Sequence, residues 1–366
     1  MNNKGFTLVE LLAAIIILSL LALLASTSVT NVVKNSKSDL YNSQMTLIKS
    51  AAELWGADNL SMLPNAGECK YLTLGDLKKY GTLDSNIINP KTNEEFSDDM
   101  LIKISSKDTG YGSLNIGYEV DADDIKGCSK ISISFAVDDW ETIISNVKSG
   151  SLENYKVGDT KEIILESSDG KIDGIYTVRI ANMSTPQECN SDNFSQTACG
   201  FVIEFADIIS LEQMNSSSNS NGGWKDSSLR KYVTEYILSS FPKQLENKLL
   251  KTKVISGCNK NETDNFVTDD DIFLLSPTEV WGKDGISNDT VKDKTRQLDY
   301  YKNIGVTTSN YAGAAKKGGN SWWLRSSDKS QESTFHFVRY DGVWNNSGTA
   351  YAANAKTGVS PAFRIG

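Results

Sequence analysis

The chain has 366 residues, more than one average domain, so two folded units with a further segment are expected. Its net charge of -9 and sequence pI near 4.9 argue against binding nucleic acid through a broad basic surface. The single histidine, His336, leaves little material for histidine-based metal sites or catalytic dyads.

The first predicted element is a long helix. Residues 11–33 carry no charge, and 23 helical residues reach about 34 Å, enough to cross a hydrocarbon core of about 30 Å. Glu10 lies in the first turns, where an ionised carboxylate is costly unless a partner neutralises it. An ordinary secretory signal with a cleavage site at residues 25–28 is the alternative, and both the length of the run and Glu10 oppose it.

Residues 5–10, GFTLVE, resemble the class III signal shared by type IV prepilins and pseudopilins. The resemblance implies that a prepilin peptidase cuts between Gly5 and Phe6, removing a leader of residues 1–5. It also implies N-methylation of Phe6. Glu10 would then pair with the N-terminal amine of a neighbouring subunit, and Thr7 belongs to the same assembly segment.

The same resemblance implies a location and a set of partners. The precursor would cross the cell membrane once and then pass into an extracellular pilus on the cell surface. Its partners would be other pilin subunits in a helical homo- or hetero-filament and the pilus assembly machinery. Many pilins carry a proline within this helix. The present chain departs from them, because its first proline is Pro64, well beyond the expected membrane part at 6–33.

The helix is expected to continue to about residue 58, giving an N-terminal pilin helix over 6–58. Beyond the membrane part it becomes amphipathic, so that one face can pack on a globular head. Periodicity does not distinguish this packing from packing in a filament core. The apolar residues that recur at steps of three, four or seven are Val29, Val33, Leu40, Leu47, Ala51 and Leu54.

Residues 59–137 predict a small pilin head with an antiparallel sheet. Strands are expected at 101–104, 114–120 and 131–137, where apolar residues alternate or run together between Gly, Asp and Ser. Residues 70–96 resemble the loop between helix and sheet in pilins of Gram-positive bacteria, where a short helix precedes an Asn-Pro turn.

Residues 138–366 predict a second, larger domain of the mixed α+β class, without repeats. Helices are expected at 229–238 and 242–248. Strands are expected at 162–165, 176–181, 201–205, 272–275, 335–339 and 362–365.

The five cysteines are widely spaced and contain no Cys-x-x-Cys pair, which argues against zinc and thioredoxin-like chemistry. Outside the cytoplasm disulfides become possible. Cys69 and Cys128 flank the head and are candidates for one bridge, with two buried thiols as the alternative. Cys189 and Cys199 are candidates for a second, small ring, which leaves Cys258 unpaired.

The C-terminal part resembles an uncharacterised domain family common on bacterial surface proteins. The resemblance rests on WLRS at 323–326 and GVSPAF at 358–363, and it extends back to residue 158. The region also resembles C-type-lectin-like folds, including formylglycine-generating enzymes and the variable proteins of diversity-generating retroelements. Those enzymes use a late cysteine pair as a copper site, whereas no cysteine follows Cys258 here, so we expect no catalytic residues and no cofactor.

Aromatic and amide side chains in this region form a candidate ligand surface for a glycan or a protein. Core packing of the aromatics and ordinary turn formation by the asparagines are the alternatives. The candidate residues are Trp322, Tyr340, Trp344, Asn345, Asn346, Tyr351 and Asn354.

Charged residues in the second domain predict no metal site. Residues 269–271 are three aspartates without the alternate spacing and glycine of a calcium loop, so a solvated run before a strand is favoured. Arg325 and Arg364 are predicted to be structural ion-pair partners rather than substrate clamps.

The sequence therefore predicts a type IV pilin subunit, major or minor, whose C-terminal domain is displayed for adhesion or ligand binding. A pseudopilin of a type II secretion or competence system is the alternative, because it shares the N-terminal signal. A pilus-tethered enzyme is the least favoured of the three.

Overall fold

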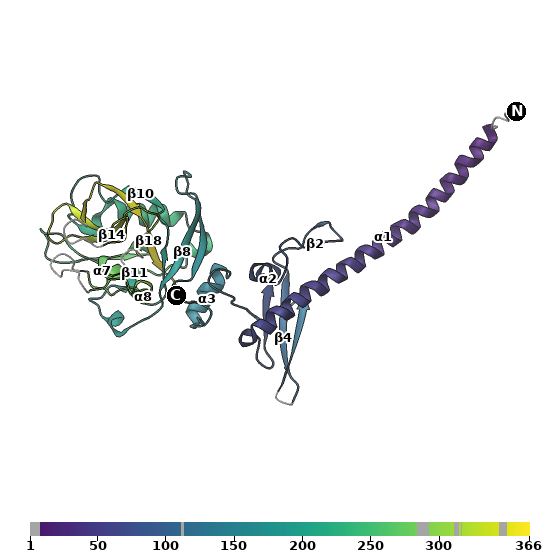
Figure 1. Cartoon of the computed structure of the whole chain (residues 1–366), viewed down its shortest axis with the longest axis horizontal. Helices are drawn as coiled ribbons and strands as arrows, with labels where there is room; N and C mark the ends of the chain where they lie inside the picture. The colour runs from purple at the N-terminus through teal and green to yellow at the C-terminus, as the bar shows by residue number, and fades with distance from the viewer. Residues whose placement is uncertain (1–7, 111–112, 284–292, 311–314, 316, 344–349) are drawn as a thin grey trace. The chain divides into compact units, whose positions relative to one another are not determined.

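The computed structural model describes residues 8–110, 113–283, 293–310, 315, 317–343 and 350–366, without the side chains of 10, 21–31, 61, 350 and 351. The chain forms two compact units, Met1–Ile133 and Ser134–Gly366. Both combine helices with small sheets, so the predicted α+β class is confirmed (Figure 1). The second unit begins a few residues before the boundary predicted at 138.

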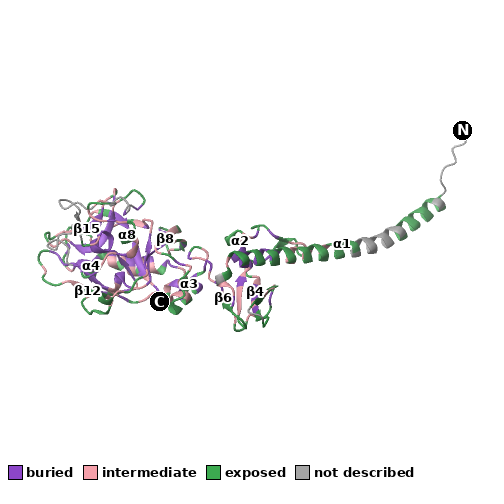
Figure 2. Cartoon of the chain, turned by 60° about the horizontal axis from the view of Figure 1, so that its bottom comes forward, coloured by how far each residue is buried: buried purple, intermediate pink, exposed green. Residues whose placement is uncertain are grey.

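The first unit is built on α1, Leu8–Asp58. Its last turns bury Ile48, Ala52 and Trp55 against the head, and Trp55 meets Tyr80 edge to face with the ring centroids 6.4 Å apart. Most of the described surface of α1 is exposed (Figure 2). Over the part of the chain that the structure describes, none of the helices combines the length and the apolar character that a membrane span requires.

The head has a four-stranded sheet in the order β5-β4-β1-β6. Its strands are β1 (Cys69–Thr73), β4 (Leu101–Asp108), β5 (Leu114–Val120) and β6 (Ser129–Lys130). β1 is antiparallel to β4 and parallel to β6, and β4 is antiparallel to β5. β5 has the predicted bounds, and β4 begins where predicted.

The predicted strand at 131–137 is wrong. Its side chains do alternate between buried and partly exposed, which imitates a strand. The Ile131 N–H donates to the Tyr71 carbonyl of β1, but the chain then turns, because the Val137 and Asp138 N–H groups donate to the Ser134 carbonyl. The alternation of apolar and polar residues here therefore reflects side-chain burial and not the backbone pairing of a strand.

Short elements connect α1 to the sheet. η1 (Leu60–Met62) follows α1, and α2 (Leu74–Tyr80) follows β1. Thr73 and Asp76 form a capping box at the start of α2, and Gly81 ends it with φ of 90°. A small hairpin, β2 (Ile88–Asn89) with β3 (Glu94–Glu95), comes next.

The second unit contains a five-stranded antiparallel sheet in the order β13-β18-β9-β8-β7. Its strands are β7 (Thr160–Leu165), β8 (Gly174–Asn182), β9 (Val202–Phe205), β13 (Ile272–Leu274) and β18 (Pro361–Arg364). Each overlaps a predicted strand. β7 is an outer strand.

A second five-stranded sheet has the order β10-β17-β14-β15-β16, and β11 pairs with β12 separately. The strands are β10 (Ser210–Gln213), β11 (Thr252–Ser256), β12 (Phe266–Asp270), β14 (Trp322–Ser327), β15 (Thr334–Val338), β16 (Ala350–Ala352) and β17 (Lys356–Val359). Only β15 was predicted.

Helices fill the connections of this unit. They are α3 (Trp140–Ser149), η2 (Gln187–Asn190), η3 (Gln196–Ala198), α4 (Gly223–Asp226), α5 (Ser228–Lys231), the π-helical η4 (Tyr232–Ile237), α6 (Lys243–Glu246), α7 (Pro277–Trp281) and α8 (Asp299–Asn303). The predicted helix at 229–238 is thus α5 continued by a π-helix.

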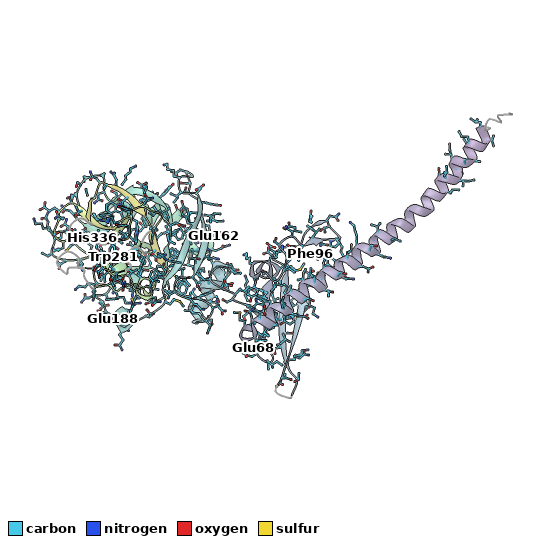
Figure 3. The ribbon with its side chains drawn as sticks, viewed as in Figure 1. Glu68, Phe96, Glu162, Glu188, Trp281 and His336 are labelled. Atoms are coloured by element: carbon cyan, nitrogen blue, oxygen red, sulfur yellow. A yellow bond between two sulfur atoms is a disulfide. The ribbon has the colours of Figure 1, made fainter. Side chains whose placement is uncertain are left out.

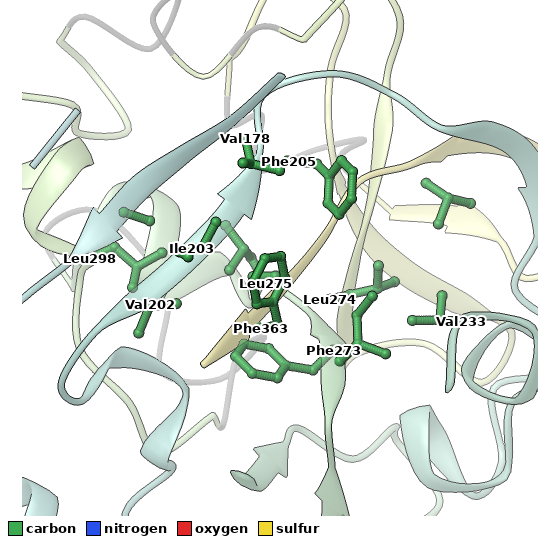
Figure 4. Close-up of a cluster of buried hydrophobic side chains, with 14 of the residues drawn as sticks. Val178, Val202, Ile203, Phe205, Val233, Phe273, Leu274, Leu275, Leu298 and Phe363 are labelled. Atoms are coloured by element: carbon green, nitrogen blue, oxygen red, sulfur yellow. The ribbon is translucent and has the colours of Figure 1, made fainter. Parts of the chain in front are cut away.

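One hydrophobic core unites the two larger sheets. Phe205 of β9 and Phe363 of β18, both labelled in Figure 4, have ring centroids 6.4 Å apart. Phe363 also lies against Trp140 of α3, with ring centroids 6.5 Å apart. Val178 and Phe273 pack into the same cluster. Loops far apart in sequence are therefore held on one scaffold.

Candidate functional site

The predicted processing residues precede the described helix. Gly5, Phe6 and Thr7 lie outside the described residues, and α1 begins at Leu8. Glu10 belongs to α1, but its side chain lies outside the described part. Cleavage, methylation and charge pairing at these positions therefore stay predictions.

A row of exposed apolar residues follows α1 beyond residue 32. Val33, Leu40, Leu47 and Leu54 are spaced seven residues apart, and each is between 49% and 55% exposed. The sequence left open whether this stripe packs on the head or in a filament core. Of the predicted stripe the head buries Ala51, and it otherwise covers the neighbouring face. We call the four residues the α1 seam.

Small residues alternate with the α1 seam. Ser36, Ser43, Ser50 and Ala57 are exposed and lie three residues after each seam residue, so the two sets together follow the a and d positions of a heptad. The Ser43 hydroxyl donates to the Asp39 carbonyl at 2.9 Å, so it is satisfied within its own helix. Large and small positions in this order let a second helix approach closely.

The candidate ligand surface is only partly supported. Trp322 is fully buried in β14, where its indole N–H donates to the Ala315 carbonyl at 3.0 Å, so its assignment to a surface is wrong. Tyr340 is 60% exposed, and Asn354 is exposed. The side chain of Tyr351 and the remaining candidates, Trp344, Asn345 and Asn346, lie outside the described residues.

Two disulfides are present, and they join the two pairs named from the sequence. Cys69 bonds to Cys128 in the first unit, and Cys189 bonds to Cys199 in the second. Cys258 is free and buried, with its thiol donating to the Glu262 carbonyl at 3.5 Å.

A buried charge cluster lies on β8 and β9. The Glu204 carboxylate accepts from Arg179 Nε and from Lys317 Nζ, both at 2.7 Å, and from the Tyr301 hydroxyl at 2.9 Å. Burial lowers the pKa of Lys317 to about 8, while the Glu204 carboxylate opposes this shift. Burial would raise the pKa of Glu204, but Arg179 and Lys317 together hold it below its usual value. The hydrogen bonds of Lys317 to Glu204, Phe205 and Ser360 indicate a structural role.

The two predicted structural arginines differ. Arg325 forms a buried bidentate pair with Glu279 at 2.6 and 2.7 Å, as predicted. Arg364 forms no ion pair with any described residue, so that part of the prediction is wrong. Its guanidinium lies beside Gly200, and burial lowers its pKa.

The aspartates at 269–271 are not a uniform solvated run. Asp270 is buried and accepts from Arg230 Nη2 at 2.6 Å and from the Trp224 indole at 2.9 Å. Asp271 pairs with Lys251 at 2.6 Å. No cluster of three or more potential metal ligands occurs within the described ranges.

The described part of the second unit is hollowed by clefts. One, of about 460 Å³, lies between β8 and β10 and is lined by Ile175, Leu211 and Asn320. Another, of about 470 Å³, lies between β7 and residues 239–244, with Trp140 at one end. Sequence reasoning missed both, because each wall comes from segments that are distant along the chain.

Two known family models match this chain, one at each end. Residues 1–26 match the prokaryotic N-terminal methylation motif, and residues 201–366 match a domain of unknown function, DUF6273. No curated protein and no solved structure matches the chain. Residues 1–26 thus carry a type IV prepilin-like signal, the kind of signal that a prepilin peptidase processes before assembly with other pilins.

Proposed function

We propose that this chain is a type IV pilin subunit that is cleaved between Gly5 and Phe6, methylated on Phe6 and assembled into a surface filament. The precursor would be held in the cell membrane by residues 6–33, and Glu10 and Thr7 would take part in subunit contacts. The second unit would be displayed for adhesion or ligand binding, without a catalytic role.

The α1 seam carries this proposal. Four apolar side chains at heptad spacing stay exposed although the head buries the neighbouring face of α1. Exposed apolar surface of this extent on one helix indicates an interaction site. The seam continues from the prepilin-like signal at 1–26 along one helix, so processing and packing belong to one element.

The experiment compares filament formation by two double variants. Leu40→Ser/Leu47→Ser removes two seam side chains that are 55% and 51% exposed, and we expect filaments sheared from cells to fall at least tenfold. Lys49→Ser/Glu53→Ser is the matched control, because it alters an exposed ion pair, at 3.8 Å, off the seam. Normal filaments from the seam variant would refute the proposal.

A pseudopilin of a secretion or competence system remains the second candidate, supported by the shared signal. Immunogold electron microscopy separates the two. Label along surface filaments supports a major pilin, and label at tips supports a minor one. Label confined to the cell envelope supports a pseudopilin. We further propose that the second unit has a C-type-lectin-like fold and an adhesive role. Glycan arrays probed with the full chain test the adhesive role of this unit.

A further inference from the structure

β7 is an outer strand with an open side. The Ile180 N–H of β8 donates to the Asp159 carbonyl at 3.0 Å, whereas the Glu166 N–H donates away from β8, to the Ser240 carbonyl at 3.0 Å. Successive residues of a strand direct their backbone groups to opposite sides. Thr160, Glu162 and Ile164 therefore turn their N–H and carbonyl groups away from β8.

These backbone groups are unused. Among the described residues, the N–H and carbonyl groups of 160, 162 and 164 form no hydrogen bond on the open side of β7. An open strand edge is a template for pairing with another extended chain. The bond from Glu166 to Ser240 closes the edge at one end, so about three outward-facing residues remain available.

A cleft runs beside this edge. It has a volume of about 470 Å³, within the usual range for binding sites, and its opposite wall is residues 239–244. Phe241 and Trp140 in its lining are buried and belong to the hydrophobic core. Glu162 on the open strand is labelled in Figure 3. The edge thus faces a space that can hold an added strand.

The rim has a defined chemical character. Glu162, Ile164 and Glu166 are all exposed, and Ile164, 56% exposed, pairs across the strands with Ile175, 65% exposed. The nearby ammonium groups are engaged: Lys161 donates to the Asp138 carbonyl at 2.6 Å, and Lys243 pairs with Glu246 at 2.6 Å. The rim therefore offers an apolar centre between two carboxylates without ion-pair partners among the described residues.

We propose that the β7 edge is a docking site for an extended segment of a partner polypeptide that carries an apolar side chain between two basic ones, at alternate positions. The partner's backbone would pair with 160, 162 and 164. Its apolar side chain would cover Ile164 and Ile175. One basic side chain would lie opposite Glu162, and the other would reach the Glu166 carboxylate from beyond the paired residues. The site does not depend on filament assembly.

A second copy of β7 is a poor occupant. Antiparallel pairing over residues 160, 162 and 164 would set Glu162 of one copy opposite Glu162 of the other. Like charges directly opposite each other in a sheet are destabilising. Charge complementarity therefore selects a basic segment from a different protein.

The test uses the full chain, solubilised in mild detergent, and three labelled peptides with blocked ends. The basic peptide is Thr-Lys-Thr-Ile-Thr-Lys-Thr, the acidic peptide has Glu in place of Lys, and the third is a scrambled form of the basic peptide. We expect saturable fluorescence anisotropy binding of the basic peptide only. In Glu162→Lys/Glu166→Lys the preference should invert, with the basic peptide weakened by about 2-fold to 30-fold.

Backbone pairing has its own readout. Addition of the basic peptide should slow hydrogen exchange of the amides at 160, 162 and 164, while the amides of 161 and 163 are already protected by β8. Glu162→Pro removes one outward N–H, which an outer strand tolerates, and should abolish binding. Glu162→Thr keeps that N–H and is the matched control, with binding only weakened.

Several results would overturn the proposal. Equal binding of the basic, acidic and scrambled peptides, or no binding of any, would do so. Binding that survives Glu162→Pro would exclude edge pairing. If the charge-reversed variant does not fold, the proline and threonine pair still decides. Self-association of the chain that Glu162→Pro abolishes would show that a second copy is the occupant.

Discussion

At the scale of single residues, Gly56 of α1 has no room for a side chain, because Tyr118 of β5 packs against it. A Cβ at this position would lie 1.9 Å from the Tyr118 Oη of β5 and 3.4 Å from Leu63 Cδ2. The sequence predicted that the helix ends near residue 58, and α1 does end at Asp58, so Gly56 lies within its last turn. The reason for glycine is the approach of a side chain from a distant strand.

Gly56→Ala should therefore destabilise the head. Alanine in a helix interior is normally favoured over glycine by about 0.5–1 kcal/mol. Here the tyrosine ring must move, and we expect a loss of about 1–3 kcal/mol in the free energy of unfolding. Urea-dependent hydrogen exchange of β4 and β5 amides measures it.

Gly56→Ala/Tyr118→Phe is the control for this variant. It removes the Oη atom at 1.9 Å and should recover most of the loss, although Tyr118 Cζ at 3.0 Å remains close. A stabilised Gly56→Ala protein would mean that the contact with Tyr118 is unimportant.

At the scale of elements, Asp299 at the start of α8 ties that helix to the end of β8. Its carboxylate accepts from the Met183 and Ser184 N–H groups at 3.0 and 2.9 Å, and it pairs with Arg296 at 3.1 Å. Burial would raise the pKa of Asp299, but the Ser184 hydroxyl, these N–H groups and Arg296 together lower it.

Because the folded pKa is depressed, the stabilising contribution of Asp299 is present above the unfolded value near 3.8 and is lost as pH falls through the lower folded pKa. Asp299→Asn should cost about 1–3 kcal/mol at pH 7 and less at pH 2 to 3. Urea unfolding at both pH values measures the difference. The exposed Asp269→Asn is the control, and an equal cost for Asp299→Asn at pH 7 and pH 2 would contradict the assignment.

The strands show which signals the sequence carries. β5, β7, β8 and β18 were predicted because apolar residues alternate or run together between turn residues. Trp323 was recognised as part of a strand-like segment, but β14 was given no bounds, because its three apolar residues are followed by Arg325 and two serines, although all six of its residues are buried. Its burial depends on Glu279, which lies 46 residues earlier in the chain and neutralises Arg325. A partner at that separation leaves no local pattern.

The candidate sites also divide into those that a local sequence pattern predicts and those that depend on distant segments. The prepilin-like signal could be predicted because its chemistry lies within six consecutive residues. The α1 seam was visible as a heptad, but its exposure depends on which face the head covers. The open edge of β7 could not be predicted, because strand order in the sheet follows from pairings between distant segments.

At the scale of the whole molecule, each unit has one disulfide, and the two close loops of different length. Cys69–Cys128 spans a separation of 59 residues, and Cys189–Cys199 spans 10. Constraining the unfolded chain predicts a cost of about 4 kcal/mol for Cys69→Ser/Cys128→Ser and about 3 kcal/mol for Cys189→Ser/Cys199→Ser.

Hydrogen exchange read by mass spectrometry assigns each loss to its unit. Peptides from Met1–Ile133 should lose protection in the first variant, and peptides from Ser134–Gly366 in the second. Cys258→Ser serves as the control that retains both bridges. Loss of protection in the wrong unit would contradict the independence of the two loops.

The spacing of the α1 seam also determines a handedness. An ideal helix turns about 20° short of two full turns in seven residues, so the four seam residues drift by about 60° around α1 from Val33 to Leu54. A neighbouring helix that stays on these residues must follow that drift and wind around α1 in a left-handed sense. The handedness of any helix pairing along the α1 seam thus follows from the interval of seven between four apolar side chains.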